Sequence, residues 1–147
     1  MRLWSVDLLK FLPDLQFKGQ LREMMLILRD WRDKGYTNHL LINKVMEYPK
    51  NDFARFFVYY EALYHERYGK WLNTQWEEFK AFDDTPVDER SNGIFKGWHN
   101  KEYLRICMSN LFEKHKYGVG KSRISDEEWE ILLDGYKQIT NGENYVI

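Results

Sequence analysis

The stretch Asp14–Lys34, DLQFKGQLREMMLILRDWRDK, carries the clearest indication of the fold. Its apolar residues recur in steps of four, three, four and three, which is the period of an amphipathic α-helix. These residues are Phe17, Leu21, Met24, Leu28 and Trp31. Gly35 follows directly and suits the left-handed position that ends many helices. The spacing therefore predicts a long helix with one buried face.

Helical periodicity continues along the rest of the chain. It predicts helices over residues 38–48, 51–68, 71–82 and 100–114, and a last helix that opens with a capping box formed by Ser125 and Glu128. No alternating strand pattern is present. Residues 83–97 have no periodicity, so we expect a flexible loop there, a candidate hinge or lid. The sequence predicts an all-α fold with a single compact domain over residues 1–147 and about five to six helices.

The charge of the chain is unevenly distributed. The net charge is −1, but residues 1–50 hold nine Lys and Arg against six Asp and Glu, and residues 101–123 hold six against two. Residues 124–147 hold one against six. The acidic end therefore hides basic segments that suit a polyanionic partner.

Composition also indicates the environment in which the protein works. Cys107 is the single cysteine, and neither a signal peptide pattern nor an apolar run of roughly 20 residues is present. We therefore expect a cytoplasmic protein outside the membrane. Aromatic residues make up 17% of the chain, which favours a binding surface in addition to a core.

Two motif fragments point to other chemistries but are incomplete. Gly118–Ser122, GVGKS, ends like a phosphate-binding loop, but His115 stands where the first glycine of that loop would be. His65 and Glu66 open like the zinc-protease motif HExxH, but Gly69 occupies the second histidine position. The sequence therefore predicts no nucleotide cofactor and no metal, with histidines that are structural or on the surface.

The helix predicted over residues 14–34 has two polar faces beside its apolar one. One face is a basic stripe of Lys18, Arg22, Arg29 and Arg32, which suits a phosphate backbone or solvent. The other holds Glu23, with Gly19 one turn before it. Glycine inside a helix costs roughly 1 kcal/mol relative to alanine, so we expect something to approach the backbone there. Glu23 alone is either an exposed carboxylate or a catalytic one.

The start of the chain offers a partner for Glu23. Arg2 is large, so Met1 is expected to be retained and to carry the terminal amine. An α-amino group titrates near pH 7.7 to 8.0, so an appreciable fraction is an uncharged nucleophile at neutral pH. Such an amine forms Schiff bases readily.

Several of these residues together resemble a known family. MRLW at the start, Leu12-Pro13, Gly19-Gln20 and Arg22-Glu23 are similar in order and spacing to the N-terminal signature of the pyrimidine-dimer DNA glycosylase (Pyr_excise) family. The run HNKEYLRICMSNLFEK, residues 99–114, resembles a late helix of that family.

The resemblance implies an all-α enzyme that acts on double-stranded damaged DNA without a cofactor. In this family the terminal amine attacks C1′ of the damaged nucleotide, and a helical glutamate assists sugar opening and β-elimination. The resemblance thus assigns catalysis to Met1 and Glu23, and DNA contact to Arg2, Arg22 and Lys114, while the basic stripe adds Lys18 and Arg29. Two alternatives stay open: a non-catalytic module of the same fold that binds nucleic acid or protein, and an enzyme that uses the same amine and glutamate on a small substrate.

Overall fold

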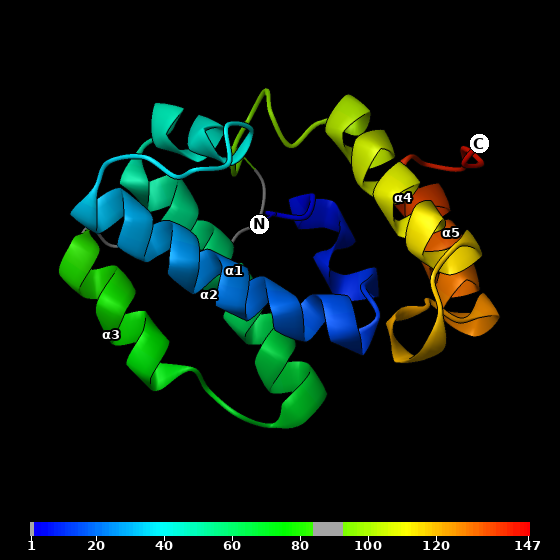
Figure 1. Cartoon of the computed structure of the whole chain (residues 1–147), viewed down its shortest axis with the longest axis horizontal. Helices are drawn as coiled ribbons and strands as arrows, with labels where there is room; N and C mark the ends of the chain where they lie inside the picture. The colour runs from blue at the N-terminus through cyan, green and yellow to red at the C-terminus, as the bar shows by residue number, and fades with distance from the viewer. Residues whose placement is uncertain (1, 84–92) are drawn as a thin grey trace. The chain divides into compact units, whose positions relative to one another are not determined.

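The computed structural model describes residues 2–83 and 93–147, and within them the chain forms helices and no strand. The all-α prediction is therefore confirmed (Figure 1). The α-helices are α1 (Asp14–Asp33), α2 (Lys50–Tyr68), α3 (Asn73–Phe82), α4 (Lys101–Lys116) and α5 (Asp126–Ile139). Short 3-10 helices are η1 (Val6–Phe11), η2 (Ile42–Glu47) and η3 (Gly120–Ser122). No helix in the described ranges is both long enough and apolar enough to cross a bilayer.

The chain divides into two compact units. The first comprises Met1–Leu3 and Gln20–Lys96, and the second comprises Trp4–Gly19 and Gly97–Ile147. Helix α1 is continuous and passes from the second unit to the first after Gly19. Whether the two units act as the single domain expected from the sequence stays a prediction. Most of the loop predicted over residues 83–97 lies outside the described residues, because the description stops at Asp83 and resumes at Gly93.

The core of the first unit is largely aromatic. The rings of Phe57 and Phe79 stack with centroids 4.6 Å apart, and those of Phe53 and Phe79 meet edge to face at 5.0 Å, which joins α2 to α3. Trp31 of α1 meets Phe82 edge to face at 5.1 Å. Aromatic pairs in such geometries stabilise a core beyond the area that they bury. Many of the aromatic residues that are abundant in the sequence therefore pack the core of this unit.

The second unit packs η1 and α4 against α5, and α4 and α5 lie side by side (Figure 1). The buried face of α4 consists of Leu104, Cys107, Met108 and Leu111. The predicted capping box is present, since Ser125 accepts a hydrogen bond from the Glu128 backbone and Glu128 accepts one from the Ser125 backbone. These caps satisfy amide groups that the first turn of α5 leaves without helical partners.

The helix predicted over residues 38–48 is wrong in its first part. Only Ile42–Glu47 is helical, as the 3-10 helix η2. The residues before it form a loop in which Thr37 and Asn43 exchange hydrogen bonds between side chain and backbone. Such local bonds give the backbone an alternative to helical pairing. The helices expected over residues 14–34, 51–68, 71–82 and 100–114 are present with shifts of one or two residues at their ends.

Candidate active site

Glu23 lies in the middle of α1, within the first unit, and its side chain is half-buried. It follows Gln20 by three residues, so both side chains project from the same side of the helix. The neighbours of Glu23 in sequence, Met24 and Met25, are buried in the core. Burial of the apolar face of α1 therefore fixes the side of the helix from which Glu23 projects.

Gln20 connects this part of α1 to the beginning of the chain. Its side chain is 1% exposed, and its Nε2 donates a hydrogen bond of 2.8 Å to the backbone carbonyl of Arg2. Leu3, which follows, is fully buried. The backbone at Arg2 is thus anchored one helical turn from Glu23. Met1, the expected source of the amine, lies outside the described residues.

The basic residues of the first unit differ in what they contact. Arg22 is exposed on α1. Arg29 forms a two-pronged ion pair with Glu78 of α3, with its Nε at 3.2 Å and an Nη at 3.0 Å from the two carboxylate oxygens. This hydrogen bonding raises the pKa of Arg29 and lowers that of Glu78. Arg29 therefore serves α1–α3 packing in this structure, whereas Arg22 presents its charge at the surface.

The second unit holds the other two predicted DNA contacts. Lys18 is exposed on α1, and Lys114 is exposed in the last turn of α4. The carbonyl of Lys114 accepts a hydrogen bond of 3.2 Å from Ile124, so the turn after α4 folds back onto the helix end. A Cβ at Gly118 would overlap this carbonyl, which explains one glycine of the GVGKS run by close packing.

The histidines have structural roles or lie at the surface in the part of the chain that is described. His99 is buried, and its Nδ1 accepts a hydrogen bond of 3.0 Å from the Val6 backbone. Burial lowers the pKa of His99 to about 3, so the ring is neutral. His65 stacks on Trp71 with centroids 3.9 Å apart. Among residues 2–83 and 93–147 no group of three or more His, Cys, Asp or Glu is arranged to hold a metal ion.

A surface pocket of about 410 Å³ lies in the second unit, along α4 and the end of the chain. Arg105 and Phe112 of α4 line it, together with Tyr145 of the chain end. Tyr145 and Ser109 share a hydrogen bond of 2.8 Å that holds this end against α4. None of the predicted site residues lines the pocket.

Gln20 is the residue of this region that sequence reasoning missed. Its burial and its bond to Arg2 depend on the three-dimensional path of the first residues, which no local pattern indicates. The one available signal was its place in the Gly19-Gln20 fragment of the family signature.

Comparison with known proteins assigns the chain to a family. Residues 1–78, more than half of the 147, match the family described as pyrimidine dimer DNA glycosylase. The chain is thus a helical protein of DNA repair. It belongs to the pyrimidine dimer DNA glycosylase family, as the resemblance in its first 30 residues indicated. Neither the curated proteins nor the solved structures compared with the chain give a match.

Proposed function

We propose that this chain removes a damaged pyrimidine from double-stranded DNA and then cuts the strand, with the amine of Met1 as nucleophile and Glu23 as the assisting carboxylate. Family membership supports the glycosylase activity. The observation that carries the pairing of amine and carboxylate is the hydrogen bond from Gln20 to the Arg2 carbonyl, one turn from Glu23. The residue next to Met1 is thereby held at the helix that carries the glutamate.

The proposed chemistry proceeds through an imine. The uncharged amine attacks C1′, a C–N bond forms, and the glycosidic bond breaks with its electron pair leaving on the base, which takes up a proton. Glu23 assists the sugar ring to open, so that O4′ gains a proton and C1′ becomes the iminium carbon. Loss of a proton from C2′ then breaks the C3′–O bond and cuts the strand. Water hydrolyses the imine and regenerates the amine.

The phosphate backbone is proposed to lie against Arg2, Lys18, Arg22 and Lys114. Cations at such positions release counterions from DNA and supply binding free energy that does not depend on sequence. Arg29 is proposed to contribute less, because its guanidinium is already paired with Glu78. No cofactor is needed for the proposed steps.

Borohydride trapping tests the amine chemistry directly. An untagged chain mixed with duplex DNA that contains a pyrimidine dimer or an abasic site should give a covalent adduct. An added N-terminal tag should abolish it. Absence of an adduct from the untagged chain, when a control lyase reacts, would refute the proposal.

The role of Glu23 is tested separately. Glu23→Gln should lower strand cleavage by at least about 100-fold, the usual scale for a lost acid–base group, and leave the Kd for DNA nearly unchanged. Asp30→Asn is the matched control, since Asp30 is a half-buried carboxylate of the same helix. Equal loss in both variants would show that Glu23 acts through helix stability.

The two alternatives predict other outcomes of the same assays. A binding module would bind DNA with strong salt dependence and give no adduct. An enzyme for a small carbonyl substrate would form an adduct with an aldehyde or ketone and show no preference for damaged DNA.

A further inference from the structure

The loop after α1 exposes two adjacent leucines. Leu40 is 85% exposed and Leu41 is 87% exposed, and Tyr36 of the same loop is 54% exposed. Single exposed leucines are common on protein surfaces. Two consecutive ones at the tip of a loop form an apolar projection, which we call the leucine tip and define as Leu40 and Leu41.

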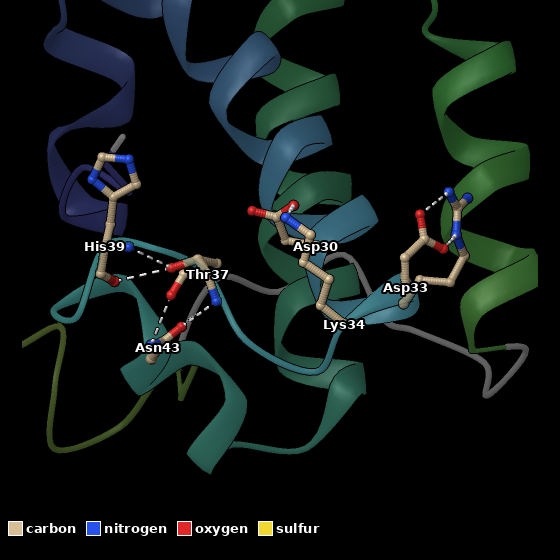
Figure 2. A network of polar contacts seen from close by, with 7 residues as sticks. Asp30, Asp33, Lys34, Thr37, His39 and Asn43 are labelled. Atoms are coloured by element: carbon tan, nitrogen blue, oxygen red, sulfur yellow. Dashed lines mark hydrogen bonds and ion pairs between the residues drawn. The ribbon is translucent and has the colours of Figure 1, made fainter.

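Thr37, His39 and Asn43, on the two sides of the leucine tip, form a closed network of hydrogen bonds (Figure 2). Asn43 accepts a hydrogen bond of 2.6 Å from the Thr37 backbone and donates one of 3.2 Å to the Thr37 carbonyl. The Thr37 hydroxyl donates to the His39 carbonyl at 3.0 Å and accepts from the His39 backbone at 3.1 Å. Thr37 itself is 2% exposed. These bonds tie the two sides of the loop together and restrain the backbone that carries the tip.

The residues after the tip anchor it from the other side. Ile42 and Val45, in η2, are buried in the first unit. The change from exposed Leu41 to buried Ile42 occurs between neighbouring residues. The path of the backbone therefore directs the leucine tip away from the core. An apolar projection that is held rigidly loses little conformational entropy when it binds a partner.

The surroundings of the tip suit a polyanion. Residues 34–50 hold three lysines against one glutamate. Asn38, His39 and Lys44, on the two sides of the tip, are exposed and can donate hydrogen bonds to phosphate oxygens. An apolar projection with donors around it matches proteins that insert a leucine, methionine or phenylalanine between base pairs.

We propose that the leucine tip wedges between two stacked base pairs of duplex DNA and opens that step. The inference takes its partner from the proposed function and goes beyond it, since it concerns how the duplex is distorted and not how the sugar is cleaved. Burial of two leucine side chains releases free energy of the same order as the cost of unstacking one base step. The distortion makes extrusion of a damaged nucleotide easier, because part of the stacking has already been lost.

The test uses 2-aminopurine, whose fluorescence rises on unstacking, placed at successive positions of damaged and undamaged duplexes. The intact chain should raise the fluorescence at one step several-fold. Leu40→Ala/Leu41→Ala should lose most of this rise and weaken duplex binding roughly 10- to 30-fold. Leu15→Ala/Ile131→Ala, two exposed apolar residues elsewhere, is the matched control and should behave like the intact chain. Circular dichroism verifies that each variant is folded.

The outcomes separate this proposal from the proposed function. If Leu40→Ala/Leu41→Ala unstacks and binds DNA like the intact chain, or if the intact chain binds without any rise in fluorescence, the wedge is refuted even where the lesion is cut. If the intact chain unstacks the duplex through the leucines but never cuts a dimer, the wedge stands and the glycosylase proposal fails. Lack of any duplex binding overturns both. A self-associated chain that becomes monomeric on leucine substitution, with unstacking unchanged, would assign the tip to contact between copies.

Discussion

At the scale of single residues, Gln20 is the connection between the start of the chain and α1. Gln20→Met removes the donor of this part-buried hydrogen bond to the Arg2 carbonyl, which should lower the free energy of unfolding by roughly 0.5–1.5 kcal/mol. If the anchor positions the amine, single-turnover trapping at an abasic site should slow by roughly tenfold or more. The Kd for DNA should stay nearly constant. The control is Gln75→Met, because Gln75 is a half-buried glutamine of α3. An unchanged trapping rate in Gln20→Met would contradict the positioning role of Gln20.

His99 makes the stability of the fold depend on pH. Its pKa is lowered to about 3 by burial, whereas an unfolded histidine titrates near 6.5. Between these values the unfolded chain binds a proton that the folded chain does not, so stability is complete above about pH 6.5 and falls on acidification, by up to about 1.4 kcal/mol per pH unit. Urea unfolding between pH 5 and 6.5 should show this slope before most carboxylates titrate.

His99→Asn keeps an acceptor for the Val6 amide but has no titrating ring. The variant should be less stable than the intact chain at pH 7 because of lost packing, and its stability should change little between pH 5 and 6.5. His39→Asn, at an exposed histidine, should retain the slope. Identical pH profiles for all three proteins would show that His99 is not the group responsible.

At the scale of elements, two helix glycines that look alike in the sequence should respond in opposite directions to alanine. A Cβ at Gly19 of α1 meets no atom within 4 Å, so Gly19→Ala should raise the free energy of unfolding by up to about 1 kcal/mol. A Cβ at Gly135 of α5 would overlap the ring of Phe11, so Gly135→Ala should lower it by about 1–3 kcal/mol. Denaturant titrations measure both, and a stabilised Gly135→Ala would contradict the packing of α5 against η1.

Gly19→Ala also bears on the active site. The open space at Gly19 is compatible with the expectation that the sugar or the chain terminus approaches the helix there. In that case the Gly19→Ala variant is more stable and yet slower in trapping. Equal trapping rates for Gly19→Ala and the intact chain would show that Gly19 has no role in the reaction and only lowers the stability of the helix.

At the scale of the whole molecule, the proposed binding to DNA requires local basic groups, because the net charge of the chain is −1. The logarithm of the binding constant should fall linearly with the logarithm of salt concentration, by about 0.9 for each phosphate contact. Alanine at Lys18, Arg22 or Lys114 should each reduce this slope by about 1. Arg29→Ala should change it less, because Glu78 already neutralises that guanidinium. An equal change at Arg29 would mean that the pair opens when DNA binds.

The family and the fold class could be predicted from the sequence because their signals are local. The apolar period of residues 14–34, the capping box at Ser125 and the left-handed conformation of Gly35 after the first long helix are all present in the structure. The helix expected over residues 38–48 is wrong in its first part. There the side chain of Asn43 pairs with the Thr37 backbone and the hydroxyl of Thr37 pairs with the His39 backbone, and helix propensity does not predict such bonds.

Most of the helices, the family and the candidate pair of an amine and a glutamate could be read from the sequence, since periodicity, caps and a short signature depend on near neighbours along the chain. The polar groups that already have partners within the chain became visible only in the three-dimensional structure. It pairs Arg29 with Glu78, buries His99 as a neutral acceptor and ties Gln20 to Arg2. It also leaves Leu40 and Leu41 exposed to solvent on a hydrogen-bonded loop. Burial and pairing between residues far apart in sequence depend on how the backbone folds, and a local pattern carries no record of them.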